Sequence, residues 1–132
     1  MLIAMQAHLL TPIINVADID ASFAWFERFG WQKRWDYGEP PSFGVVGNGP
    51  CEIFLCQNAQ GGRGPGLGAW MTMWVTNVDA VYENCQAQGI EVIRPPTDEP
   101  WNVREMHVRH PDGHVFRVSQ SAPHDHEHPH SH

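Results

Sequence analysis

Residues 16–30 read VADIDASFAWFERFG, and residues 75–89 read VTNVDAVYENCQAQG. In both segments a short polar residue, Asp18 or Asn77, stands where it can cap the first turn of a helix. A glycine ends each segment, as is common where a helix terminates in a left-handed residue. Apolar residues recur with a helical period in each: Ile19, Phe23 and Phe26 in the first, and Val78, Val81, Tyr82 and Cys85 in the second. The two segments therefore predict two similar amphipathic helices in a chain made of two related halves.

Strand-like runs surround each predicted helix in the same order. They lie at 9–16, 32–37, 42–46 and 51–57 in the first half, and at 69–75, 91–95, 103–109 and 115–119 in the second. The connecting sequences GEPP, GNGP, RPP and HPDG carry turn residues. The order is thus βαβββ, twice. We predict one domain at 1–120, with modules at 8–57 and 69–120, a flexible glycine-rich linker at 58–68, and a histidine-rich tail at 121–132.

Composition narrows the function classes. A net charge of -7 with only eight Lys and Arg residues argues against a nucleic-acid partner. The chain has no run of about 20 apolar residues, and its start lacks the basic segment of a signal peptide, so we expect no membrane partner. Three cysteines, Cys51, Cys56 and Cys85, with no CxxC pair, are typical of free thiols. We therefore expect a cytoplasmic protein.

With this repeat, residues 8–120 resemble the vicinal-oxygen-chelate superfamily, which includes glyoxalase I, extradiol dioxygenases and bleomycin resistance proteins. The resemblance implies an α+β fold in which two βαβββ modules form a curled mixed sheet around a cleft. Metal enzymes of this superfamily place His and Glu ligands at four cleft-facing positions, which here read Thr11, Phe54, Trp70 and Arg117. None of these is a usual ligand of a divalent metal. The resemblance therefore implies no metal or other cofactor in the cleft, and it favours a binding protein over an enzyme.

Two stretches resemble the bleomycin resistance branch in particular. They are LGAWMTMWVTNVDAVY at 67–82 and PWNVREMHVRHPDG at 100–113, although Asn102 stands where Gly is usual and His110 where Asp is usual. Proteins of that branch are two-fold dimers that often exchange the first strand and hold a drug between subunits without chemistry. The resemblance thus implies a homodimer that sequesters an aromatic antibiotic or related natural product, with a role in antibiotic resistance.

Strand alternation separates the residues that face the predicted cleft from those under the helices. The purely apolar faces, such as Ile53 with Leu55 and Phe116 with Val118, should pack under the helices. The opposite faces mix aromatic and polar side chains, which suits a ligand site. The predicted ligand-binding residues are Thr11, Trp35, Phe43, Glu52, Phe54, Trp70, Thr72, Trp74, Trp101, Arg104, His107 and Arg117. The indole rings would stack on a planar ligand, and Arg117 would bind a carbonyl or carboxylate.

Other functions stay open at this point. Glu105 and His107 share a strand face and are a candidate acid–base pair, but no nucleophile is apparent beside them. The alternative to sequestration is a glyoxalase-like lyase, isomerase or dioxygenase with an atypical metal site. A third hypothesis is an accessory protein that recognises a peptide or a carrier-bound intermediate. The tail offers an adventitious metal site at His124, His126, His128 and His130.

Overall fold

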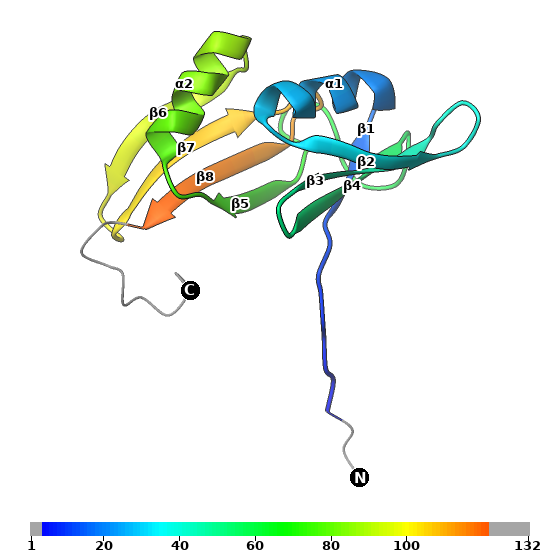
Figure 1. The fold of residues 1–132 in the computed structure, drawn as a ribbon, viewed down its shortest axis with the longest axis horizontal. Coiled ribbons are helices and arrows are strands. Elements are labelled where there is room, and N and C mark those ends of the chain that lie inside the picture. The colour runs from blue at the N-terminus through cyan, green and yellow to red at the C-terminus, as the bar shows by residue number, and fades with distance from the viewer. Residues whose placement is uncertain (1–3, 122–132) are drawn as a thin grey trace.

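A computed structural model describes residues 4–121 of the chain, and its elements repeat one order twice (Figure 1). The first module comprises β1 (Ile13–Val16), α1 (Ile19–Phe29), β2 (Gln32–Tyr37), β3 (Phe43–Asn48) and β4 (Cys51–Gln57). The second comprises β5 (Trp70–Trp74), α2 (Val78–Gln88), β6 (Val92–Glu99), β7 (Val103–Arg109) and β8 (Val115–Ser121). The metal site predicted in the histidine-rich tail lies outside the described residues.

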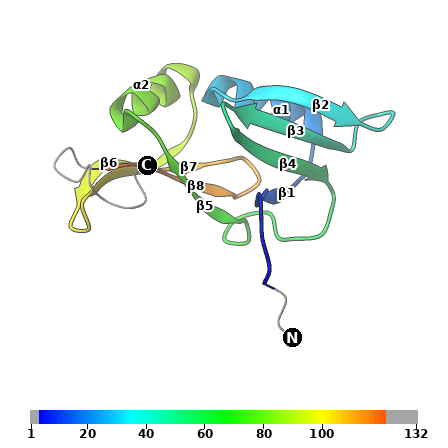
Figure 2. The same ribbon diagram turned by 60° about the horizontal axis from the view of Figure 1, so that its bottom comes forward.

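Each module forms one four-stranded mixed sheet, ordered β1-β4-β3-β2 in the first and β5-β8-β7-β6 in the second. In each sheet the first strand runs parallel to the last, and the other neighbours are antiparallel. The two sheets lie side by side with both helices on the same side (Figures 1 and 2). This arrangement confirms the predicted α+β fold of two βαβββ modules. Within residues 4–121, no helix is long and apolar enough to cross a membrane.

Both helices begin and end as the sequence predicts. The side chains of Asp18 and Asn77 each accept a hydrogen bond from the backbone N–H three residues later, at 3.1 Å in both cases. Gly30 and Gly89 close the helices with φ angles of 101° and 69°, in the left-handed region that favours glycine. The helix ends predicted from the sequence are therefore confirmed in both modules.

A second helix cap comes from the far end of each module. The side-chain oxygen of Gln57, the last residue of β4, accepts the backbone N–H of Ile19 at 2.8 Å. Gln120 near the end of β8 accepts the N–H of Val78 in the same way at 2.7 Å. These N–H groups belong to the first helical turn, which has no partner within the helix. The repeat thus extends to a hydrogen bond that ties each helix to the last strand of its own sheet.

The hydrophobic core is shared between the modules through α1. The rings of Trp25, Phe26 and Phe29 all lie against Phe116 of β8, with centroids 6.0, 5.9 and 5.7 Å away. The first helix therefore covers a residue of the second sheet as well as its own sheet. The apolar faces predicted to lie under the helices are confirmed as buried: Ile53, Leu55, Phe116 and Val118.

A buried histidine, His110, joins the turn after β7 to α1. Its Nδ1 accepts the backbone N–H of Asp112 at 3.0 Å, so this nitrogen carries no proton. Its Nε2 then donates to the Ser22 hydroxyl at 2.7 Å. Burial lowers the pKa of His110 to about 3, and neighbouring His114 adds to this effect. The residue therefore stays neutral over the range in which an ordinary histidine would charge.

The second histidine of the same turn, His114, links three parts of the chain. Its Nδ1 accepts the backbone N–H of Ala69 at 2.9 Å, and its Nε2 donates to the carbonyl oxygen of Asn15 at 2.7 Å. These bonds connect β8 to the start of β5 and to β1 of the other module. A polar contact between the modules thus accompanies the aromatic one.

The glycine-rich segment 58–68, predicted to be a flexible linker, has backbone contacts with the turn at Gly113. The N–H of Gly64 donates to the Asp112 carbonyl oxygen at 2.6 Å. A Cβ atom on Gly68 would lie 2.3 Å from the carbonyl oxygen of Gly113, and one on Gly113 would lie 2.2 Å from that of Gly64. The absence of a Cβ at Gly68 and Gly113 therefore permits a close approach of two backbones.

We predict that stability depends on pH through His110. The folded-state pKa of about 3 lies below the unfolded value of 6.5, so the unfolded chain binds a proton between these values while the folded chain does not. The contribution of His110 is fully present above pH 6.5 and is lost as pH falls. Between pH 7 and pH 5 the free energy of unfolding should fall by about 2 kcal/mol from this residue alone. Urea unfolding of wild type and His110→Asn at pH 7 and pH 5 gives the free energy of unfolding of each protein at each pH. The loss of stability between the two pH values should be larger in wild type than in the variant. An equal loss in the two proteins would refute the prediction.

Candidate functional site

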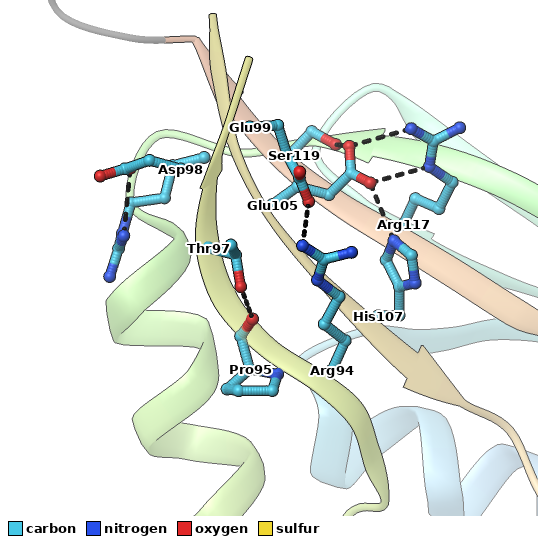
Figure 3. A network of polar contacts seen from close by, with 10 residues as sticks. Arg94, Pro95, Thr97, Asp98, Glu99, Glu105, His107, Arg117 and Ser119 are labelled. Atoms are coloured by element: carbon cyan, nitrogen blue, oxygen red, sulfur yellow. Dashed lines mark hydrogen bonds and ion pairs between the residues drawn. The ribbon is translucent and has the colours of Figure 1, made fainter. Parts of the chain in front are cut away.

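The face of the second sheet turned away from the helices carries charged and aromatic side chains together. In the strand register, Thr72 lies opposite Arg117, and Arg117 lies opposite His107. Residues opposite each other in a sheet share a face, so these side chains are neighbours. Glu105, Ser119 and the pair Arg94–Glu99 lie on the same face (Figure 3).

The centre of this face is the buried carboxylate of Glu105, whose side chain is 3 % exposed. Arg117 donates to it twice, from Nε at 3.0 Å and from Nη2 at 3.1 Å. His107 Nε2 lies 2.8 Å from Oε2, and the Ser119 hydroxyl donates to Oε1 at 3.1 Å (Figure 3). Each carboxylate oxygen therefore has two hydrogen-bond partners.

This environment keeps Glu105 ionised. Burial raises the pKa of Glu105, but hydrogen bonds from Arg117, His107 and Ser119 outweigh burial and hold that pKa below its ordinary value. The guanidinium of Arg117 balances the negative charge at contact distance. The two residues thus act as one bidentate ion pair set into the sheet.

The four positions at which the resemblance would place metal ligands, Thr11, Phe54, Trp70 and Arg117, offer no ligand set typical of a divalent metal ion. Trp70 and Phe54 carry no ligating atom for a divalent cation, and Arg117 is cationic and engaged with Glu105. Glu105 itself has both oxygens occupied by donors. Within residues 4–121, no three His, Cys, Asp or Glu side chains converge so that they could hold a metal.

Beside the Glu105–Arg117 pair lies a hollow of about 320 Å³. Its lining residues are Thr72, Trp74, Trp101, Val103, Glu105, Arg117 and Ser119. Trp101 stands in the turn between β6 and β7 and remains 55 % exposed. Apolar ring surface and a guanidinium thus meet in one concave site, which is the composition expected for a small-molecule pocket.

The open face of the first sheet is different, because it is mainly aromatic. The ring centroids of Trp35 and Phe43 are 5.7 Å apart, and those of Phe43 and Phe54 are 5.3 Å apart. Glu52 pairs with Arg34 at 2.9 Å near the end of this face. This surface carries stacking area without a central buried charge.

A groove of about 370 Å³ lies between the two sheets. Thr11 and Glu52 line it from the first module, and Thr72 and Trp74 line it from the second. Thr11 precedes β1, which begins at Ile13 rather than at residue 9 as the sequence predicts. The groove therefore brings together predicted site residues of both modules.

The predicted ligand-binding residues fall into three places. One group gathers on the second sheet: Trp70, Thr72, Trp74, Trp101, His107 and Arg117. A second group lies on the first sheet or in the groove: Thr11, Trp35, Phe43, Glu52 and Phe54.

Arg104 is apart from both groups, on the side of the second sheet that the helices cover. It donates to Asp79 of α2 at 2.9 and 3.0 Å and to Asp98 at 3.1 Å. Glu105 is absent from the predicted set although it organises the site. The signal was present, because alternation places Glu105 on the face of His107 and its neighbour Arg104 on the opposite face.

Comparison with known proteins gives a family match and several similar folds. The family model described as Glyoxalase/Bleomycin resistance protein/Dioxygenase superfamily matches residues 6–118. No curated protein sequence matches the chain significantly. The structure of TioX from Micromonospora sp. ML1 superposes with a TM-score of 0.75 at 19% identity, covering 87% of this chain and 99% of that one.

Two further structures are similar at low identity. The bleomycin resistance determinant encoded on transposon Tn5 gives a TM-score of 0.70 at 18% identity, covering 87% of this chain and 98% of that one. A bleomycin-binding protein complexed with bleomycin gives a TM-score of 0.67 at 16% identity, covering 87% of this chain and 99% of that one. At these identities the likeness shows a shared fold.

We predict that loss of Arg117 alone destabilises the protein more than loss of the whole ion pair. Arg117→Gln leaves the buried Glu105 carboxylate without its main partner, which should cost about 2 kcal/mol of unfolding free energy. The double variant Glu105→Gln/Arg117→Gln removes both charges and should cost less. Urea denaturation compares these variants with Arg109→Gln, whose exposed pair with Glu91 should be worth less than about 0.5 kcal/mol. A double variant less stable than Arg117→Gln would contradict the prediction.

Proposed function

Since the chain belongs to the glyoxalase/bleomycin resistance protein/dioxygenase superfamily, we propose that it binds a small aromatic molecule and sequesters it unchanged. The proposed ligand is an aromatic antibiotic or a related natural product, and the proposed location is the cytoplasm. The observation that carries the proposal is the hollow formed by Trp74 and Trp101 beside Arg117. Bleomycin binding by one protein of similar fold supports this ligand class.

Exposed indole rings support binding of a flat ligand. Trp70, Trp74 and Trp101 are each at least half exposed on the open side of the second sheet. Covering apolar surface releases about 25 cal/mol per Å², and a well-placed ring pair adds about 0.5–1.5 kcal/mol. A planar ligand that covers two of these rings would thus gain affinity without any conformational change in the sheet.

The chemistry of the site supports sequestration over turnover. The side chains at the superfamily's metal positions offer no ligand set, and the carboxylate of Glu105 is fully engaged. His107, the remaining acid–base candidate, has one ring nitrogen held by Glu105 and its ring edge against Trp70, with centroids 5.7 Å apart. A lyase, isomerase or dioxygenase in this cleft would require a metal arrangement unlike that of the superfamily.

A homodimer is the proposed assembly. The segment before β1 projects away from the body (Figure 1), and its Leu10 is 93 % exposed. Leu9, Ile13 and Tyr37 add further exposed apolar surface in the first module. Apolar area of this extent is typical of interfaces. In a two-fold dimer, the aromatic face of one first sheet would cover the second sheet of its partner, and the two groups of predicted site residues would form one cleft.

The proposed function predicts ligand binding that depends on Trp101. Tryptophan fluorescence should be quenched by bleomycin-type glycopeptides or planar aromatic drugs. Trp101→Ala should weaken binding about tenfold, because an indole wall is lost. Leu67→Ala removes another exposed apolar side chain, from the 58–68 loop, and should bind as wild type does.

Mass spectrometry of the recovered ligand separates sequestration from turnover. An unmodified ligand after prolonged incubation supports the proposal. A converted ligand, or a stoichiometric metal in protein truncated after Ser121, would favour the enzyme instead. Truncation is needed because the tail histidines can bind metal adventitiously.

The proposed assembly predicts a dimer that the N-terminal segment stabilises. Light scattering during size-exclusion chromatography should give twice the chain mass at micromolar concentration. Leu10→Asp should shift the protein towards monomer, since a charge cannot be buried unpaired at low cost. Leu67→Asp places the same charge on another exposed leucine and should remain dimeric. A wild-type monomer at these concentrations would contradict the assembly.

A further inference from the structure

Resting on the proposed function, we propose that the ligand class of this site is planar aromatic carboxylates, bound through the outer edge of the Arg117 guanidinium. Such a ligand has a flat ring that can stack on the tryptophans and a negatively charged carboxylate that can bind Arg117. It follows from how the hydrogen bonds on the open face of the second sheet are already distributed.

Arg117 uses only one edge of its guanidinium within the protein. Its Nε and Nη2, which form the side-on edge of the guanidinium, both donate to Glu105. The end-on edge is formed by Nη1 and the second hydrogen of Nη2, and no described contact of Arg117 uses Nη1. Two parallel N–H groups at this edge match the two oxygens of a carboxylate. The side chain is 36 % exposed and lines the hollow, so a ligand can reach this edge.

Glu105 fixes the direction in which this edge points. Because the carboxylate holds Arg117 at two atoms, the guanidinium plane cannot rotate freely about the side-chain bonds. A fork oriented in advance loses little entropy when a second carboxylate binds. The geometry therefore favours an anion that approaches end-on, from the hollow.

Among the described residues that line the hollow, Glu105 carries the one carboxylate, and its side chain is too buried to attract a cationic ligand. Both oxygens of Glu105 have two partners each, as described above. Glu99, on the same face, is only 6 % exposed in its side chain and lies 3.0 Å from Arg94 Nη2 (Figure 3). The accessible charge in the hollow is thus the positive edge of Arg117.

The overall negative charge of the protein does not reverse this preference. The net charge of -7 is distributed over the whole chain, and charges on the surface are screened beyond about 8–10 Å at physiological ionic strength. A carboxylate in contact with Arg117 is about 3 Å from its partner. The contact interaction therefore dominates affinity, while the distant charge mainly slows association.

The surrounding side chains select a flat ring next to the carboxylate. Trp74 and Trp101 supply ring faces in the same hollow, and Thr72 lies directly opposite Arg117 in the strand register with a hydroxyl available beside it. A carboxylate attached directly to an aromatic ring can contact the fork while the ring lies on an indole. An aliphatic acid would use the fork but leave the rings exposed to water.

The test uses three probes with one ring system: 2-naphthoate, the neutral 2-naphthamide and the cationic 2-naphthylmethylammonium. Isothermal titration calorimetry of the full chain at fixed ionic strength should give 2-naphthoate the highest affinity. Its advantage over 2-naphthamide should be at least about tenfold, as expected for charge-assisted hydrogen bonds. The cation should bind most weakly.

Two variants assign the preference to Arg117. Arg117→Gln should bring the affinities for 2-naphthoate and 2-naphthamide within about threefold of each other. If that variant does not fold, Glu105→Gln/Arg117→Gln removes both charges of the pair and gives the same readout. Arg63→Gln removes an equal charge from the exposed 58–68 loop, where it pairs with Asn58, and should retain the wild-type preference.

The outcomes distinguish this inference from the proposed function. Equal affinity for the three probes, or a preference for the cation, would overturn the inference but leave aromatic binding intact. A carboxylate preference that survives in the double variant would also overturn it. Absence of binding by all three probes would count against the proposed function itself.

Discussion

Packing of α1 against Phe116 sets the architecture of this chain. One helix contacts a residue of the other module's sheet, both helices lie on the same side, and the opposite faces of the two sheets remain open. The buried histidines of the HPDGH turn reinforce this junction with hydrogen bonds to α1 and β1. The open faces, rather than the shared core, are then the surfaces on which the two modules can differ in chemistry.

The buried carboxylate of Glu105 is the second constraint, and it acts on function. An ionised carboxylate inside a sheet requires compensation, since an unpaired buried charge costs several kcal/mol. Arg117, His107 and Ser119 provide this compensation from neighbouring strands. The same bonds occupy the oxygens that a metal would need and orient the guanidinium towards the hollow. The Glu105–Arg117 pair therefore both stabilises the second sheet and fixes the position of the positive charge beside the hollow.

The sequence predicted features that depend on neighbours along the chain. Helix caps at Asp18 and Asn77, terminal glycines and the apolar faces of β4 and β8 all follow from local spacing, and the structure confirms them. Features that depend on distant partners were missed. The Gln57 cap lies 38 residues from its helix, and the 58–68 loop is held by a turn near Gly113. Arg104 was predicted among the ligand-binding residues although alternation places it on the other face of the strand from Glu105, and its side chain donates to Asp79 of α2.

The repeat also shows how two similar halves come to offer different chemistry. In the first module, Ile13 of β1 lies opposite Phe54 of β4, and both are apolar. At the matching place in the second module, Thr72 of β5 lies opposite Arg117 of β8, and both are polar. The backbone pairing is the same, so the difference lies in the side chains alone. The first module thus presents apolar side chains at the position where the second presents a hydroxyl and a guanidinium, so the two open faces differ in the contacts that they can make.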